Sequence, residues 1–301
     1  MASIAKTVVA TGASSGLGFE VIKHLLAQPQ PYRFILGVRD VPTTQAAYNR
    51  VQYDKSQHTL TLLPLELSDL RTVKTFAGQV LERLGGNAGE GIDYLMLNAA
   101  RSHAAEGPGP NGSKWCETYV VNHLSQHYLV HLLRDKLVAS ASRLVFVSSG
   151  AVNMVKDPST LSTTLLANSG AAPMTVYPAS KLAALYGAHW WRRELAGKCT
   201  VVAVSPGLIP DTGLSRGMPD AMSKSNLPPE VFKDAKSVEE GAASILAAFT
   251  RADFPEDLNR IFLTSWGEWW PAETIRASLD KGEWERWCRG REEIERDGGV
   301  V

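Results

Sequence analysis

The sequence is poor in cysteine and has no paired cysteine motif. Its three cysteines, Cys116, Cys199 and Cys288, lie far apart and form no CxxC pair. Secreted domains that depend on disulfides are much richer in cysteine than this. The pattern therefore favours a thiol-reducing compartment.

The sequence also lacks an excess of either charge and any long apolar run. It has 31 basic and 31 acidic residues, so its formal net charge is zero, and we expect neither nucleic acid nor an anionic membrane as a partner. No run of 18 apolar residues is present, so no membrane span is expected. A strand pattern starts almost at the first residue and leaves no room for a signal peptide. We predict a cytoplasmic protein.

Short apolar, β-branched runs alternate with longer helical patterns along the chain. The predicted strands are 6–11, 33–38, 59–66, 94–99, 143–148, 200–205 and 260–265, and the predicted helices are 17–27, 69–84, 114–136, 177–196 and 238–250. Several strands are almost wholly apolar, as in parallel sheets covered on both faces. The alternation predicts an α/β fold: one Rossmann-type, doubly wound parallel sheet of about seven strands, in a single domain over residues 1–301.

Three segments depart from this alternation. Segments 150–176 and 207–236 are long and rich in Gly, Pro, Ser and Met, and we expect them to be insertions or lids on the substrate side. Segment 268–301 reads as a C-terminal helical extension. Trp284 and Trp287 fit the anchoring of an amphipathic helix, whereas Trp266, Trp269 and Trp270 fit a pocket wall and anchoring equally well.

A glycine-rich stretch, TGASSGLG, joins the first strand to the first helix. Gly12, Gly16 and Gly18 would let the backbone approach a pyrophosphate, and the helix start would supply free N–H donors. The spacing is GxxxGxG instead of GxGxxG. In this strand–turn–helix position the stretch predicts dinucleotide binding.

The end of the second strand bears on the choice of dinucleotide. Val38 stands where a carboxylate would bind a ribose 2′-hydroxyl, and Arg39 follows it. An arginine there favours the 2′-phosphate of NADP(H), with Ser14 and Ser15 as additional hydroxyl donors. The alternative is that Arg39 is a solvated loop residue paired with Asp40.

Tyr177 and Lys181 stand four residues apart in a predicted helix, so they share one face. A nearby cation stabilises a phenolate and lowers the pKa of a tyrosine. The pair is therefore a candidate acid/base device, and a surface Tyr–Lys contact is the alternative.

Several motifs occur together and in order: the glycine stretch, LNAA (97–100), VNHLS (121–125), VSSG (147–150), YPASK (177–181) and SPGLIPDTGL (205–214). In them the chain resembles the short-chain dehydrogenase/reductase superfamily over roughly residues 5–265. Within that superfamily it looks most like the group of retinol dehydrogenases and protochlorophyllide reductases. Ala100 departs from the usual NNAG motif, and the 28 positions from Ser149 to Tyr177 exceed the spacing of compact members.

The resemblance implies a catalytic tetrad. Tyr177 would be the general acid in reduction, and Lys181 would lower its pKa and bind the nicotinamide ribose. Ser149 would hold the substrate oxygen, with Ser148 as the competing assignment. Asn122 would orient a water leading to Lys181. A helix cap or kink at Asn122 and a plain strand end at Ser149 are the structural alternatives.

The resemblance also implies cofactor contacts beyond the glycine stretch, where Leu17 joins the glycines. The remaining contacts would come from the loops after four strands and from the Tyr–Lys pair: Arg39, Glu66, Leu67, Asn98, Ala99, Pro206, Gly207, Ile209, Thr212, Tyr177 and Lys181. Relatives pair through helices that correspond to 114–136 and 177–196, so a monomer and a homodimer both remain open.

The predicted activity is NADPH-dependent reduction of a ketone or aldehyde, so the enzyme would act on the CH–OH/C=O couple of its substrate. The substrate would be a medium-sized apolar or aromatic metabolite, and Tyr177 would be the general acid. Two alternatives stay open. One is reduction of a C=C or C=N bond on the same fold, and the other is a non-catalytic NADPH-binding scaffold or sensor.

Three histidines, His123, His127 and His131, recur every four residues along one predicted helix. This spacing can ligate a metal. No carboxylate or cysteine nearby completes a ligand set, so we expect a packed or solvent-facing histidine stripe and no metal.

Overall fold

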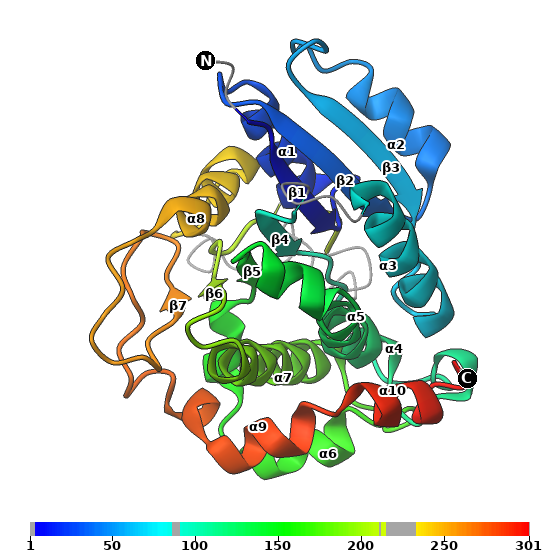
Figure 1. Cartoon of the computed structure of the whole chain (residues 1–301). Helices are drawn as coiled ribbons and strands as arrows, with labels where there is room; N and C mark the ends of the chain where they lie inside the picture. Colours follow the sequence, from blue (N-terminus) through cyan, green and yellow to red (C-terminus); the bar gives the residue numbers. More distant parts are fainter. Residues whose placement is uncertain (1–3, 86–90, 211, 215–232, 301) are drawn as a thin grey trace.

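The centre of the molecule is a sheet of parallel strands, seen in Figure 1 as a twisted diagonal band. This computed structural model describes residues 4–85, 91–210, 212–214 and 233–300. Within them the sheet has seven strands in the order β3-β2-β1-β4-β5-β6-β7. The strands are β1 (Lys6–Thr11), β2 (Tyr32–Val38), β3 (Thr59–Pro64), β4 (Tyr94–Leu97), β5 (Arg143–Val147), β6 (Thr200–Val204) and β7 (Phe262–Leu263). The order reverses between β1 and β4, and ligands of such sheets bind beyond the strand ends at that point.

Helices cover both faces of the sheet (Figure 1). One face carries α1 (Gly16–Leu26), α2 (Val41–Tyr48) and α8 (Val238–Thr250); the other carries α3 (Leu70–Leu84), α5 (Ser125–Ala139) and α7 (Pro173–Glu194). The short α4 (Glu117–Tyr119) and a π-helical turn (Val120–Leu124) lead into α5. Outside α5 and α7 lie α6 (Leu161–Thr164), α9 (Lys281–Trp287) and α10 (Arg291–Asp297).

Alternation along the strands divides the core into two layers. Val8 and Ala10 of β1 pack toward α1 and α8, whereas Val9 packs toward α3 and α5. All three side chains are fully buried. Because both faces of each central strand are apolar, the sheet requires helices on both sides.

The predicted fold class is confirmed, and each of the seven predicted strands overlaps a strand of the structure. The helices differ from the prediction in three places. Helix α2 was not predicted, although Asp40 caps it by accepting a hydrogen bond from the Thr43 N–H and Pro42 lies in its first turn. The helix expected over 114–136 is divided by the π turn. Helix α7 begins at Pro173 and continues through Pro178, ahead of the expected start at 177.

The expected insertion 150–176 contains two 3-10 turns, Gly150–Met154 and Pro158–Thr160, followed by α6. Its second half is held by backbone hydrogen bonds to the loop after β4, such as Cys116 N–H to Leu165 O (2.9 Å) and Ala105 N–H to Ala171 O (2.9 Å). Leu161 and Leu165 are fully buried. Within this insertion, only the turn Gly150–Met154 lies directly after Ser149 in the chain. Most of the expected insertion 207–236 lies outside the described residues.

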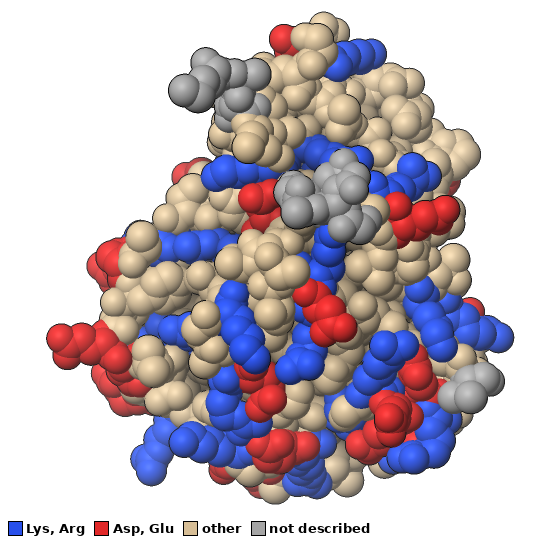
Figure 2. All heavy atoms as spheres, in the orientation of Figure 1, with Lys and Arg blue, Asp and Glu red and all other residues tan. Residues whose placement is uncertain are grey.

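The described helices include none with the length and apolarity needed to cross a bilayer. On the face shown in Figure 2, basic and acidic side chains are interspersed. That distribution agrees with the balanced composition.

Candidate active site

Tyr177 and Lys181 lie one turn apart near the start of α7, close to the end of β5. Lys181 is 2% exposed, and its Nζ donates to the Val147 carbonyl oxygen (2.8 Å). The same Nζ lies 5.8 Å from the centroid of the Tyr177 ring. The helix therefore places the ammonium beside the phenol, as its spacing predicts.

The pKa values of this pair differ from the sequence expectation. Burial raises the pKa of Tyr177 to about 12, and only a hydrogen bond with the Ser149 side chain acts to lower it. Burial also lowers the pKa of Lys181 to about 8. Loss of hydration dominates the pKa of Tyr177, and Lys181 is not among the groups that shift it. A lowering of this pKa by Lys181 together with a bound cofactor stays a prediction.

The two serines after β5 point to different places. Ser149 begins the turn Gly150–Met154, where its Oγ accepts a hydrogen bond from the Ala151 N–H (3.2 Å), and its side chain reaches Tyr177. Ser148 is 3% exposed, and its hydroxyl is directed at the Lys181 carbonyl oxygen at 3.5 Å. Ser149, not Ser148, shares the space beside the phenol.

Asn122 sits in the π turn, where the helix is wider than an ordinary α-helix. Its Oδ1 accepts from the Arg101 N–H (2.8 Å), and its Nδ2 donates to the Arg101 carbonyl (2.9 Å) and the Ser180 hydroxyl (2.9 Å). The amide thus joins the loop after β4 to α7, next to Lys181. Such π turns occur often at functional sites.

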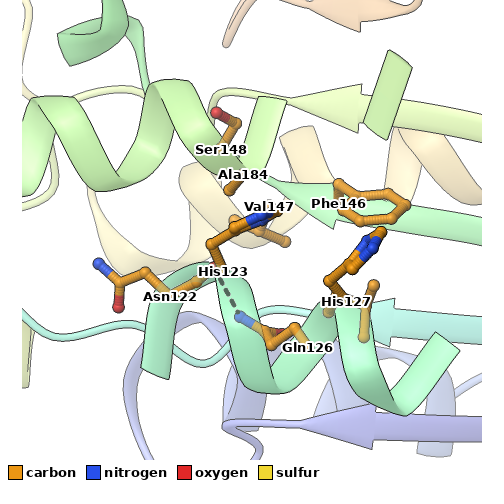
Figure 3. Close-up of a pocket in the computed structure, with 9 residues that line it drawn as sticks. Asn122, His123, Gln126, His127, Phe146, Val147, Ser148 and Ala184 are labelled. Carbon is orange, nitrogen blue, oxygen red and sulfur yellow. Dashed lines mark hydrogen bonds between the residues drawn. The ribbon is translucent and has the colours of Figure 1, made fainter. Parts of the chain in front are cut away.

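A small cavity lies behind these residues, between the π turn, β5 and α7. Its lining comprises Leu97, Asn122, His123, Gln126, His127, Phe146, Val147, Ser148 and Ala184. Its volume is about 10 Å³, which is close to the space that one water needs. In Figure 3 the Asn122 amide points away from the other lining side chains, while Gln126 turns back along the helix.

The glycine turn after β1 has no room for a side chain at Gly12 or Gly18. Gly12 and Gly16 have φ values of +67° and +55°, which favour glycine. A Cβ at Gly12 would lie 2.6 Å from the Ala99 Cα, and one at Gly18 would overlap the Gly12 carbonyl. Ser15 begins α1 without a side-chain capping bond. This bare helix start fits the phosphates of a dinucleotide.

Asn98 braces the glycine turn from the loop after β4. Its Nδ2 donates to the Gly12 carbonyl (2.9 Å), and the N–H groups of Asn98 and Ala99 both donate to Thr11 Oγ1 (3.1 Å each). Thr11 in turn donates to Gln126 Oε1 (2.9 Å). The structure therefore assigns the Asn98 side chain a place inside the turn.

The loop after β6 crosses the first turn of α1. Pro206 is buried, and Gly207 has a φ of +96°. Ile209 and Leu17 both pack against Gly241 of α8, and Thr212 Cβ lies 3.7 Å from where Gly16 would carry a Cβ. These contacts bring the predicted cofactor residues of two distant segments together.

The loops after β2, β3 and β4 gather charge beside the glycine turn. Arg39 is exposed, and it makes no hydrogen bond or ion pair with another described residue; Asp40 instead caps α2. Burial, followed by repulsion from Arg39, lowers the pKa of Arg101, and Glu66 acts in the opposite direction. Leu67 is buried, and its carbonyl accepts from Ser125 of α5.

Arg101 is a charged residue that the sequence analysis passed over. Its guanidinium pairs with Glu117 and lies 2.8 Å from His103 Nδ1, while its backbone is held by Asn122. A basic residue directly after LNAA was the available signal. Only the fold shows that it shares an electrostatic environment with Arg39, because the two belong to strands on opposite sides of β1.

The histidine stripe lies under the C-terminal extension, with His123 and His127 buried and His131 partly buried. His123 lies 3.0 Å from the Trp287 carbonyl, and both His127 and His131 lie 3.0 Å from the Arg289 carbonyl. The Trp191 indole N–H donates to His127 Nδ1 (2.9 Å). Each ring thus has at least one nitrogen engaged by a protein group. Within the described ranges no cluster of three metal-ligating side chains is placed to hold an ion.

Solved structures share this architecture. The NADPH-bound carbonyl reductase from chicken fatty liver matches with a TM-score of 0.63 at 22% identity, over 88% of this chain and 98% of that one. The carbonyl reductase Sniffer of D. melanogaster matches with a TM-score of 0.61 at 16% identity, over 87% and 98%. At these identities the likeness establishes the fold.

Sequence relatives establish the family. The family model described as short chain dehydrogenase matches residues 6–222. A short-chain dehydrogenase/reductase of Pestalotiopsis microspora is 55% identical over 98% of this chain and 99% of its own. Human retinol dehydrogenase 12 is 30% identical over 68% of this chain and 61% of its own. The glycine turn, the Tyr–Lys pair and these matches agree that the chain belongs to the short-chain dehydrogenase/reductase family of oxidoreductases.

Proposed function

We propose that the protein reduces a ketone or aldehyde to an alcohol with NADPH. The observation that carries this proposal is the convergence of Tyr177, Ser149 and Lys181 at the end of β5, on the sheet edge that also holds the glycine turn. Proton donor, oxygen ligand and dinucleotide cradle would then meet at one site.

The residues divide the work of carbonyl reduction. A bound nicotinamide coenzyme would supply the hydride that adds to the carbonyl carbon. Tyr177 gives its hydroxyl proton to the carbonyl oxygen, and its pKa of about 12 keeps it protonated for this role at neutral pH. Ser149 holds the same oxygen, and Lys181 stabilises the phenolate that remains. Asn122 keeps the loop after β4 and α7 in register.

The charges beside the glycine turn support NADPH over NADH. Arg39 is an exposed cation without a described ion-pair partner, and Arg101 adds positive potential nearby. A 2′-phosphate would relieve the repulsion between these two guanidinium groups, whereas a 2′-hydroxyl would not. The carbonyl reductase from chicken fatty liver, which shares the fold, was solved with NADPH.

We also propose that the whole chain acts as one catalytic domain with the turn Gly150–Met154 on the substrate side. The extension 268–301 covers α5 and α7 through the histidine contacts. That cover uses helix surface that a second subunit would need, which supports a monomer.

The test is a comparison of the natural protein with Tyr177→Phe in an assay that follows NADPH absorbance across a panel of ketones and aldehydes. General acids contribute about 10²- to 10⁴-fold, so the variant should lose about a thousandfold in kcat while NADPH binding is unchanged. Parallel assays with NADH should give a much higher KM for the cofactor. Equal kcat for both proteins would contradict the role of Tyr177.

A further inference from the structure

Two tryptophan rings stand next to each other just after β7. Trp266 is 64% exposed, and Trp270 is partly buried. Their ring centroids are 6.2 Å apart and their planes are inclined by 52°. Neighbouring Trp269 differs: it is 9% exposed, and its indole N–H donates to the Asp253 carbonyl (3.1 Å), so it anchors the segment.

Trp270 connects this pair to the catalytic loop. Its ring stacks on Phe262 at 5.7 Å and lies 3.6 Å from where Gly150 would carry a Cβ. Gly150 directly follows Ser149, and its N–H donates to Ser205 Oγ (3.0 Å). The aromatic surface therefore begins one residue from the proposed oxygen ligand.

The loop after β6 approaches the same tryptophans from the other side. A Cβ at Gly207 would lie 3.2 Å from the Ser265 side chain, which immediately precedes Trp266. Leu208 is 46% exposed, and Met154 of the turn after Ser149 is 51% exposed. The loops after β5, β6 and β7 thus each carry a large exposed apolar side chain, as expected of a binding surface.

We propose that Trp266 and Trp270 form a substrate-binding wall, and that the preferred substrate is an uncharged carbonyl compound with a flat, fused aromatic ring system. This inference rests on the proposed reductase function. Two inclined indoles offer a ring face and a ring edge, the arrangement that aromatic rings pack against best. The Glu268 carboxylate accepts the Trp266 indole N–H (3.1 Å), and a negative charge beside this ring disfavours an anionic ligand.

The test compares 2-naphthaldehyde with octanal, two apolar aldehydes of which only one is aromatic. In Trp266→Ala/Trp270→Ala we expect KM for 2-naphthaldehyde to rise about tenfold, since each aromatic contact contributes about threefold or more. We expect the KM for octanal to rise less than about threefold, because an aliphatic chain loses only apolar contact and no ring packing. Leu258→Ala, which removes a 68% exposed apolar side chain at the other end of β7, is the matched control.

Calorimetric titration with 2-naphthylmethanol measures the affinity of the same wall for an aromatic alcohol without turnover. The double variant should bind it about tenfold more weakly, and Trp266→Phe/Trp270→Phe should recover most of the loss. Equal affinities, or equal losses for both aldehydes, would overturn the inference. Failure of the natural protein to reduce any carbonyl would count against the reductase proposal instead. If the double variant does not fold, the exposed single change Trp266→Ala provides the same comparison.

Discussion

Burial of the Lys181 ammonium reduces the folding stability of this protein. Its side chain is 2% exposed and has one described hydrogen bond, to the Val147 carbonyl. A pKa lowered from 10.5 to about 8 corresponds to about 3 kcal/mol of lost hydration. The buried ammonium of Lys181 therefore lowers the stability of the fold.

Lys181→Met should therefore stabilise the fold while removing activity. At neutral pH we expect the free energy of unfolding, measured in urea, to be about 2 kcal/mol higher in the variant. This value allows about 1 kcal/mol for the lost hydrogen bond. The unfolded chain keeps the lysine proton up to its ordinary pKa, whereas the folded chain releases it from about 8 upward. As the pH rises from about 8 to the ordinary lysine pKa of 10.5, the natural protein therefore becomes more stable. The difference in the free energy of unfolding between it and the variant should become smaller over this range.

A matched control is Lys136→Met. Lys136 also donates to a backbone carbonyl, that of Gly85 (3.0 Å), but this hydrogen bond is exposed. Its effect at neutral pH should be within about 0.5 kcal/mol. A Lys181→Met protein that unfolds more readily than the natural one at neutral pH would show that the ammonium stabilises the fold.

At the scale of elements, the turn between β1 and α1 depends on two glycines and one amide. The Gly18 position has no space for a Cβ beside the Gly12 carbonyl, which is also the acceptor for Asn98 Nδ2 (2.9 Å). A methyl group there would push apart β1, α1 and the loop after β4. The glycine turn and the sheet edge are therefore one packing unit.

Gly18→Ala should weaken NADPH binding at least about tenfold and lower the free energy of unfolding by about 1–3 kcal/mol, because overpacking displaces the turn. Gly78→Ala in α3 is the control, since a Cβ there meets nothing within 4 Å. It should stabilise the protein by about 0.5–1 kcal/mol and leave NADPH binding unchanged. Both effects can be read from fluorescence titration and urea unfolding. Unchanged NADPH affinity in Gly18→Ala would place the cofactor elsewhere.

At the scale of the whole molecule, the C-terminal extension is attached through buried neutral histidines. Burial lowers the pKa values of His123 and His131 to about 4, of His189 to about 3, and that of His127 well below its ordinary value. Trp191 occupies His127 Nδ1 as a donor, so a proton there would meet another N–H. His189 stacks on Trp284 at 5.2 Å. Acid should thus weaken the attachment of α9 and α10.

The stability of the natural protein should fall as the pH drops below about 6.5, because unfolded histidines bind protons that the folded chain excludes. In His131→Gln one of these groups is absent. The slope of unfolding free energy against pH should then decrease by about 1 kcal/mol per pH unit between about pH 6 and pH 4.5. Urea unfolding across this range measures it. An unchanged slope would mean that His131 is protonated in the folded state.

Features that depend on neighbouring residues could be predicted from the sequence of this protein. Alternating apolar strands and helices predicted the sheet, which the structure confirms. The glycine stretch, Tyr177 and Lys181 predict the site, because each of these signals also lies within a few neighbouring residues. Helix α2 could also have been predicted from Asp40 and Pro42, since caps are local too.

Properties that depend on contacts between distant segments are visible only in the folded protein. The pKa of Tyr177 follows from burial by several elements, and the proximity of Arg101 to Arg39 follows from the strand order. The separation of anchoring Trp269 from exposed Trp266 depends on what packs above each ring. Burial and electrostatic potential are sums over neighbours in space, and a linear sequence does not list those neighbours.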